Sequence, residues 1–310
     1  MAQLMTVTGT IDSSQMGFCQ MHEHLFTADT PAARANPALR IDREDLSAAE
    51  LKDYRALGGD TVVDCQPGGA GRDIGALRRI SRESGVRIVS VTGFHMPVFY
   101  PADHWVFRES AGEMRGRFER ELRQGVAADA VGEPVFPGAV KAAVGRDGAT
   151  GRFEVCLRAA AGAAARCGVP LILHTEYGIG AVRAVGVCEE EGLDPAHIAV
   201  CHADRQAADF RTHEEIARTG AYLEYDTIAR YKYHDDESEI RLIRHMLDAG
   251  FGNRLLISLD TTAARLKRYG GEPGLGYILR DFTAMLAESG VGTGEISTIT
   301  RENPRRIFES

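Results

Sequence analysis

The sequence predicts an α/β protein built as a (β/α)8 barrel, in which eight parallel strands alternate with helices. One observation is that short apolar segments alternate with helical patterns along the chain, which is typical of parallel βαβ units. A second observation is the spacing of metal-binding side chains. His174 follows Lys141 by 33 residues, His202 follows His174 by 28, and Asp260 follows His202 by 58. Because one βα unit of a barrel takes roughly 30 residues, these steps predict one, one and two units.

Eight segments are expected to form the barrel strands. They are residues 18–22, 61–65, 87–92, 135–141, 170–174, 198–202, 221–225 and 255–259. This order assigns the metal-binding side chains to strands 1, 4, 5, 6 and 8, each at the end of its strand. Catalytic groups of such barrels collect at the carboxyl ends of the strands, so the spacing also predicts one shared site.

Helical patterns occupy the intervals between these strands. The expected helices are residues 43–57, 108–128, 153–166, 181–191, 208–218 and 237–249. The alanine-rich segment before Gly168 favours a helix that ends at this glycine. Two connections are long, 93–105 after the third strand and 261–276 after the eighth. Because loops longer than about 12 residues are commonly functional, we expect both to form walls of the site.

Length and composition restrict the class of protein. The 310 residues are expected to form one domain, 1–310, and 36 basic against 44 acidic residues give a net charge of −8, which argues against nucleic acid as a partner. No segment approaches the roughly 18 to 20 apolar residues of a membrane span, and the N-terminus lacks the pattern of a signal peptide. The six cysteines show no CxxC pair, so reduced thiols and a cytoplasmic location are expected.

The side chains at the strand ends form a set of metal ligands. His22 and His24 are two positions apart, and such positions of a strand point to the same side. On a barrel strand that side is the lumen, so both imidazoles are expected to reach one ion. Together with His174, His202 and Asp260, they form a donor set that suits Zn²⁺, with Mn²⁺, Co²⁺ or Fe²⁺ as substitutes.

Lys141 differs from the other members because an ammonium group is repelled by a divalent cation. It lies in the apolar segment AVKAAV at a strand end. Burial and the charge of a metal favour its neutral, nucleophilic amine. Reaction of that amine with CO₂ gives a carbamate, an anionic ligand with two oxygens that can bridge two metal ions. A lysine modified in this way is an N6-carboxylysine.

These motifs together resemble the phosphotriesterase-like branch of the amidohydrolase superfamily, which includes phosphotriesterase-related proteins and lactonases. The resemblance extends over nearly the whole chain. It is carried by TVTGTID and MHEHLF near the N-terminus, VKAA, HTE, HAD and SLD at strand ends, and RENPRRIF near the C-terminus. It implies a TIM barrel of the amidohydrolase type, a metal-dependent hydrolase and, by the habit of the family, a homodimer.

The resemblance also implies a role for each ligand. His22, His24 and Asp260 would hold a more buried ion, His174 and His202 a more exposed one, and carboxylated Lys141 would bridge both. A hydroxide shared by the two ions would be the nucleophile. Asp260 would orient the hydroxide and carry its proton to the leaving group, and the exposed ion would polarise the C=O or P=O of the substrate.

Weaker signals surround this set. His95 opens the long loop after the third strand, where lactonases of the family often carry a tyrosine that contacts the substrate, and Tyr100 is nearby. We expect His95 to line or support the site rather than to bind metal. Asp226, at the end of strand 7, is expected to orient a neighbour or support its loop. Asp204 either accepts a hydrogen bond from a ligating imidazole or caps the following helix.

The loop after strand 8 carries a basic cluster. It contains Arg265, Lys267, Arg268 and Tyr269, and it is either solvated or a pocket for an anionic group of the substrate. Five further histidines lack a strand-end context and are expected at the surface or on helices: His104, His197, His213, His234 and His245.

Two classes of function are compatible with the residues. The first is a dinuclear metallohydrolase that opens lactones of sugars or sugar phosphates, with hydrolysis of amides, N-acyl compounds or phosphotriesters as the alternatives. The segments TGFHMPVFYP and RLKRYGGEPGLGYIL resemble those of relatives that act on sugar lactones. The second is a catalytically silent barrel that binds a ligand. Because the chain keeps all six ligands, including the proton carrier, the sequence favours the enzyme.

Overall fold

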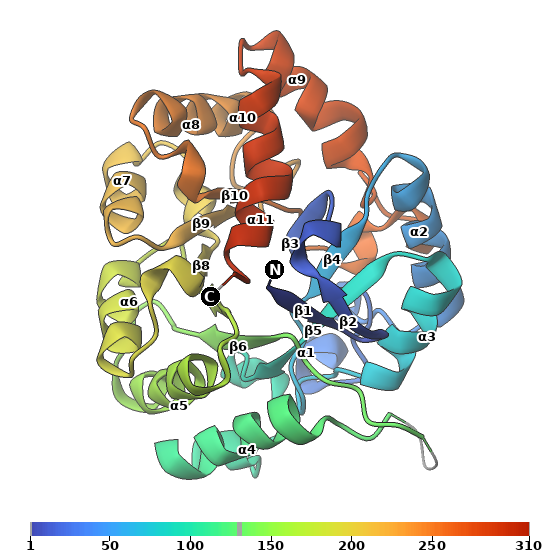
Figure 1. The fold of residues 1–310 in the computed structure, drawn as a ribbon, viewed down its shortest axis with the longest axis vertical. Helices are drawn as coiled ribbons and strands as arrows, with labels where there is room; N and C mark the ends of the chain where they lie inside the picture. Colours follow the sequence, from blue (N-terminus) through green and yellow to red (C-terminus); the bar gives the residue numbers. More distant parts are fainter. Residues whose placement is uncertain (1, 129–131, 310) are drawn as a thin grey trace.

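A computed structural model describes residues 2–128 and 132–309, and it contains the expected barrel. Eight parallel strands follow one another around a nearly closed sheet in chain order. They are β3 Cys19–Glu23, β4 Thr61–Asp64, β5 Arg87–Gly93, β6 Ala139–Ala143, β7 Leu171–His174, β8 Ile198–Cys201, β9 Tyr222–Tyr225 and β10 Leu255–Ile257. Figure 1 shows the strands in the middle of the molecule with helices around them. The predicted fold class is confirmed, and the ligands lie on barrel strands 1, 4, 5, 6 and 8 or directly after them.

The seam between the last and first strands is joined near their carboxyl ends. The backbone N–H of Asp260 donates to the carbonyl oxygen of His22 at 3.1 Å. The carboxylate of Glu23 accepts from the backbone N–H groups of Leu259 at 2.7 Å and Thr261 at 3.0 Å. Three hydrogen bonds thus position the segment that carries Asp260 against β3, although the strand ladder itself does not continue across the seam.

The α-helices of the described residues are α1 Pro31–Ala35, α2 Glu44–Ala56, α3 Ile74–Ser84, α4 Ala111–Gln124, α5 Gly151–Cys167, α6 Ala181–Glu190, α7 Phe210–Arg218, α8 Asp236–Asp248, α9 Thr283–Glu288, α10 Thr293–Ser297 and α11 Asn303–Arg306. The six expected helices correspond to α2, α4, α5, α6, α7 and α8, each with one or both ends shifted. The alanine-rich helix α5 ends at Gly168, whose φ of 64° is the left-handed conformation that glycine adopts without strain.

The amino end of the barrel is covered by elements that the periodicity did not predict. The turn between β1 (Gln3–Thr6) and β2 (Gly9–Asp12), which form a hairpin, contains Val7, whose N–H donates to the carbonyl oxygen of Ile88 at 2.9 Å. Apolar side chains from both chain ends, including Leu4 and Phe308, pack into the cluster inside the barrel. In Figure 1 the two chain ends lie close together over the middle of the barrel. This cover leaves the carboxyl ends of the strands as the open face.

Two apolar clusters form the core. The larger one lies between the sheet and the surrounding helices, and the smaller one fills the barrel with inward side chains such as Met21, Val63, Val91 and Ile172. All six cysteines are free thiols, in agreement with the expectation of no disulfides. Among the residues that the structure describes, no helix is long and apolar enough to cross a membrane.

Candidate metal centre

Imidazole and carboxylate side chains converge at the carboxyl ends of the strands. His22, His24 and Asp260 each place a possible ligand atom within 4.8 Å of the others, and so do His202, Asp226 and Asp260. Nε2 of His24 lies 3.5 Å from Oδ1 of Asp260. His22, His202 and Asp260 are buried, and His24 is largely so. The structure therefore brings together side chains that are as far as 238 positions apart in the chain.

The alternation of strand residues does not by itself point these histidines inward. Cys19 and Met21 pack inside the barrel, so strict alternation would turn His22 outward. The register between β3 and β4 runs from Gln20 opposite Val62 to Glu23 opposite Asp64, which leaves one extra residue in β3. Such a bulge reverses the phase of the following side chains and directs His22 and His24 into the barrel.

Backbone conformation redirects two further ligands. His202 has a φ of 66° and Asp260 a φ of 50°, both in the left-handed region that non-glycine residues rarely occupy. The side chain of Cys201 already faces the barrel interior. The unusual φ of His202 lets its own side chain, the next one along the chain, turn to the same region. Local strain of this kind costs on the order of 1–3 kcal/mol and commonly marks functional positions.

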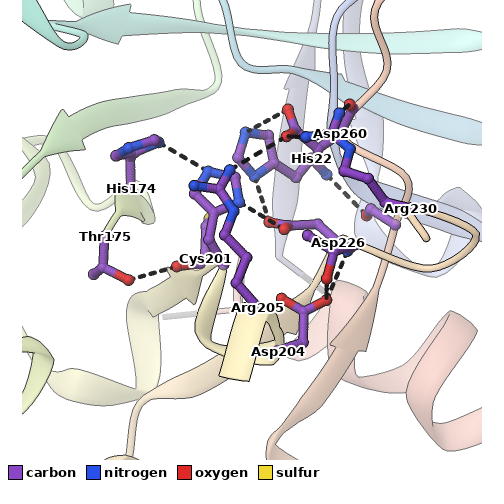
Figure 2. Close-up of polar contacts among 12 residues, drawn as sticks. His22, His174, Thr175, Cys201, Asp204, Arg205, Asp226, Arg230 and Asp260 are labelled. Carbon is purple, nitrogen blue, oxygen red and sulfur yellow. Dashed lines mark hydrogen bonds and ion pairs between the residues drawn. The ribbon is translucent and has the colours of Figure 1, made fainter. Parts of the chain in front are cut away.

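Asp226, at the end of β9, connects two of the histidines (Figure 2). Its Oδ2 lies 2.9 Å from Nδ1 of His22, and its Oδ1 lies 2.6 Å from Nδ1 of His202. A carboxylate accepts, so both imidazoles carry their proton on Nδ1 and direct the lone pair of Nε2 toward the centre. The expectation that Asp226 orients a neighbour agrees with this arrangement.

Burial determines the protonation of these groups. It lowers the pKa of His22 to about 4 and that of His202 well below the ordinary value, so both imidazoles stay neutral and able to bind metal. Burial alone raises the pKa of a carboxyl group, but contacts with His202 and His22 hold that of Asp226 below its ordinary range. Asp226 therefore remains an acceptor for both imidazoles at neutral pH.

His174 and His202 form a second convergence of nitrogen atoms. Nδ1 of His174 lies 2.8 Å from Nε2 of His202, and Nε2 of His174 lies 3.1 Å from a carboxylate oxygen of Glu176. Nε2 of His202 presents a lone pair. At 2.8 Å, this atom and Nδ1 of His174 are close enough to share either a proton or a metal ion. Glu176 was not singled out in the sequence, although it lies in the motif HTE.

Lys141 is fully buried within β6, two residues before the end of the strand. Its Nζ lies 3.0 Å from Nε2 of His22. The amine therefore lies beside the lone pair with which His22 would bind a metal ion. Lys141 has no carboxylate partner among the described contacts.

The donor set fits the divalent ions that the sequence analysis predicted. Neutral imidazoles with oriented Nε2 lone pairs and an ionised carboxylate are the ligands that Zn²⁺ and related ions prefer. Nδ1 of His24 is buried and has no hydrogen-bond partner among the described residues. His22, His24 and Asp260 are suited to hold one ion, and His174 with His202 a second, with Lys141 beside His22.

A cavity of about 300 Å³ opens above these ligands. Its apolar lining includes Leu39 and Ile41 after β3 and Met96, Val98 and Phe99 after β5. The expected contribution of the long loop after β5 is therefore present. Of the long segment 261–276 after β10, only Thr261 and Thr262 belong to the described lining, and the loops after β3, β8 and β9 also contribute. This origin of the walls follows the rule for (β/α)8 barrels.

Cationic side chains form another part of the lining. Arg205, Arg230 and Lys232, which we call the cationic wall, all lie in loops after β8 and β9. Nη1 of Arg230 lies 2.8 Å from Oδ2 of Asp260, and Nη2 of Arg205 lies 3.6 Å from the same oxygen. In Figure 2 both guanidinium groups extend toward this carboxylate. Despite burial, Arg230 and the histidines hold the pKa of Asp260 well below its ordinary value.

The comparisons with known proteins agree with this geometry. The profile of the phosphotriesterase family matches residues 2–308. This chain belongs to the phosphotriesterase family. Like other proteins of the family it is a hydrolase, and the family is metal-dependent.

Two curated relatives and one solved structure of this family illustrate its range. A phospho-furanose lactonase of Mycoplasmopsis synoviae is 27% identical over 98% of this chain and 90% of its own length. An N-acetyltaurine hydrolase of Danio rerio is 25% identical over 98% of this chain and 97% of its own. The crystal structure of a lactonase from Listeria monocytogenes is 27% identical, covers 99% of both chains and superposes with a TM-score of 0.91.

The expected substrate residues lie in different places in this family member. His95 lines the cavity, with its ring centroid 5.6 Å from that of His174 and 4.1 Å from that of Phe99. Tyr100 is buried and does not belong to the described lining; its hydroxyl accepts from the backbone N–H of His95 at 2.8 Å. Tyr100 thus supports the loop that carries His95.

The basic cluster after β10 lies outside the described lining of the cavity. Arg268 pairs with Asp53 at 2.7 Å on the surface, and the hydroxyl of Tyr269 contacts Ser47 at 2.8 Å. The guanidinium of Arg265 is buried and donates to the carbonyl oxygens of Ile228 and Ala229. None of Arg265, Arg268 and Tyr269 belongs to the described lining of the cavity, because other partners hold them. The cationic side chains that line the cavity are instead those of the cationic wall.

Two further expectations need correction. Oδ2 of Asp204 accepts from the backbone N–H of Thr227 at 2.6 Å and from its hydroxyl at 2.7 Å, so Asp204 neither binds an imidazole proton nor caps the next helix among the described contacts. His213 lies on α7, in agreement with the expectation, and its buried imidazole accepts from the hydroxyl of Tyr225 at 3.0 Å. His234, by contrast, lies in the loop after β9 and is largely buried beside Glu239 rather than at the surface.

Sequence reasoning missed the residues that act around the ligands. Glu23 joins β3 to the segment of Asp260, and burial raises its pKa to about 8 in spite of its two backbone donors. Arg205 and Arg230 were overlooked because only the loop after β10 showed clustered basic residues. The signal for Glu23 was its position between the two histidines of HEH, and that for Arg205 was its place directly after HAD.

Proposed function

We propose that this protein is a dinuclear metal-dependent lactonase whose substrate carries an anionic group. The observation that carries the proposal is the position of the cationic wall at the rim of the cavity whose floor holds His22, His24, His174, His202 and Asp260. A lactone carbonyl above the ligands would leave its substituent within reach of Arg205, Arg230 and Lys232. Phosphate is the favoured substituent, because arginine recognises its planar pairs of oxygens with two parallel hydrogen bonds.

The reaction adds water to the lactone carbonyl and breaks the ring C–O bond. When bound, the two ions supply an ionised water at neutral pH and polarise the carbonyl oxygen. Asp260 accepts the proton of the attacking water and passes it to the ring oxygen that leaves. Burial keeps His22 and His202 neutral, Asp226 fixes their orientation, and carboxylated Lys141 would bridge the two halves of the centre. The apolar residues Met96, Val98 and Phe99 exclude bulk water from the substrate.

Hydrolysis of an N-acyl compound is the second candidate. It is supported by the relatedness to an N-acetyltaurine hydrolase, whose named substrate also carries an anionic group, a sulfonate. The same centre would attack the amide carbonyl, and the cationic wall would bind the sulfonate. Phosphotriesters lack such a charge, so the cationic wall favours them less. A catalytically silent barrel is disfavoured because all six expected ligands are present.

Several finer assignments belong to the same proposal. We take zinc as the native ion and residues 1–310 as one catalytic domain, and we keep the cytoplasmic location and the homodimer as proposals drawn from the sequence. A substrate panel tests the central assignment. The zinc-reconstituted protein is assayed with phosphorylated sugar lactones, neutral lactones, N-acyl sulfonates and a phosphotriester. We expect the highest kcat/KM for a phosphorylated lactone, and a preference for neutral lactones or for the phosphotriester would contradict the anionic substrate.

A further inference from the structure

A second cluster of metal-binding side chains lies behind the loop that follows β9. Asp204, His234 and Glu239 each place one possible ligand atom within 4.8 Å of the others. They come from three successive segments, namely the turn after β8, the loop after β9 and the first turns of α8. Figure 2 shows Asp204 on the side of Asp226 that faces away from His22 and His174. The cluster is thus separate from the catalytic ligands.

The acidic members of this cluster lack partners. Glu239 is fully buried, and neither of its carboxylate oxygens has a hydrogen-bond partner among the described residues. Oδ1 of Asp204 is also buried and unpartnered, whereas Oδ2 is occupied by Thr227. A buried ionised carboxylate oxygen without a partner costs several kcal/mol, so the carboxyl groups of Asp204 and Glu239 both require a proton or a cation.

The orientation of His234 adds a third possible ligand atom beside these oxygens. Its Nδ1 lies 3.0 Å from the backbone carbonyl oxygen of Asp235, which only accepts, so Nδ1 carries the ring proton. In the neutral ring, Nε2 then presents a lone pair, which lies 3.1 Å from a carboxylate oxygen of Glu239 and 3.1 Å from the hydroxyl oxygen of Thr227, whose proton is donated to Asp204. Two electron pairs at this distance repel each other unless a positive species lies between them.

The surroundings add negative rather than positive charge. Burial, and then the nearby Asp204, Asp226 and Asp236, raise the pKa of Glu239 well above its ordinary value. Besides His234, no cationic side chain is within ion-pair distance of Glu239 among the described residues. Two carboxylates and one imidazole are a donor set that suits Zn²⁺ or Mn²⁺. The separation of 3.1 Å also suits two ligands that each lie about 2 Å from one ion.

We propose that Asp204 Oδ1, His234 Nε2 and a carboxylate oxygen of Glu239 bind a divalent cation of the zinc type, outside the catalytic centre. Its role is structural. The ion joins the turn after β8 to the loop after β9 and to α8, and this loop carries Arg230 and Lys232 of the cationic wall. The site stands on its own contacts and does not depend on the reaction that the protein catalyses.

Crystals of the zinc-loaded full chain, measured on both sides of the zinc absorption edge, test the proposal directly. We expect an anomalous peak among Asp204, His234 and Glu239, apart from any peak at His22, His24, His174 and His202. Absence of this peak at saturating Zn²⁺, with ordered side chains, would overturn the proposal and leave a shared proton as the stabilising species.

Metal content of purified variants gives an independent measurement. Glu239→Gln removes one ligand charge with little change in shape and should lower zinc by one equivalent per chain relative to wild type. Glu237→Gln is the matched control on the same helix, because the Glu237 side chain is 82% exposed, and it should keep the wild-type content. If Glu239→Gln does not fold, His234→Asn replaces it. Equal zinc content in wild type and the folded variant would contradict the site, whatever the content of the catalytic centre.

Discussion

Arg230 donates to the carboxylate of Asp260 across 2.8 Å, from the loop after one strand to the segment after its neighbour. The contact lies between the cationic wall and the proposed proton carrier. Its consequence is that Asp260 is ionised in the free protein, because Arg230 opposes the rise in pKa that burial causes. An anionic substrate that binds Arg230 would weaken this contact and make the carboxylate a stronger base.

Replacement of Asp260 by asparagine tests its role as proton carrier. Asp260→Asn keeps the shape and one oxygen ligand but does not accept a proton. Loss of a general acid–base group commonly costs about 10² to 10⁴ in rate, so kcat should fall by that factor while the fold and much of the bound metal persist. Turnover and metal content are measured on the same sample. Turnover near that of wild type would remove Asp260 from proton transfer.

Replacement of Lys141 tests the bridge between the two ions. Lys141→Ala should lose activity and bound metal, because the side chain that lies 3.0 Å from Nε2 of His22 is removed. A short carboxylic acid added to the variant should restore part of both by supplying two oxygens. In the wild type, mass spectrometry under native conditions should detect the mass of CO₂, and its loss should accompany loss of metal. An unmodified lysine in the active, metal-loaded protein would contradict the carbamate.

Replacement of Asp226 separates orientation of the ligands from chemistry. In Asp226→Asn, only one oxygen can accept, and the amide group faces the Nδ1 proton of His22 or His202. Loss of such a contact typically weakens metal affinity about 10- to 100-fold. The variant should regain most of its kcat at saturating metal, as judged by metal titration of activity. Asp248→Asn, at an exposed position of α8, is the control and should titrate as wild type.

The anion preference is tested at two basic residues that the structure places differently. Lys232 is exposed at the cavity, whereas Arg268 pairs with Asp53 on the surface. Loss of one charge-assisted contact of about 1.5 kcal/mol raises KM about tenfold. Lys232→Ala should therefore raise KM for a phosphorylated lactone by this factor, with neutral lactones unaffected, and Arg268→Ala should change neither. Equal effects of Lys232→Ala on charged and neutral lactones would refute the anion contact.

The sequence by itself determined the fold and the expected ligand set. The spacing of Lys141, His174, His202 and Asp260 reflects the length of a βα unit. This length is set by one strand, one helix and their connections, which are local in sequence. Strand order in a barrel follows chain order, so the strand that carries each ligand was predictable as well. Strand and helix ends moved by a few residues, because local patterns do not specify where the last hydrogen bond forms.

Tertiary structure alone decided how these side chains point and what surrounds them. Alternation along β3 would direct Met21 and His22 to opposite sides, and only the bulge against β4 turns His22 and His24 inward together. Asp226 reaches both His22 and His202 because β9 lies beside β8 and near the seam of the barrel, a relationship across 204 positions of chain for His22. Local sequence does not encode such contacts.

The basic residues show the same limit. Charge clustering favoured Arg268, yet the ion pair with Asp53 on α2 holds it at the surface, and the isolated Arg205 and Arg230 reach the cavity instead. A charged side chain at the surface forms an ion pair with whichever oppositely charged group lies within reach, and here those groups belong to segments that are distant in the sequence. The sequence thus specified which residues end the strands, and long-range packing selected which of the others line the cavity.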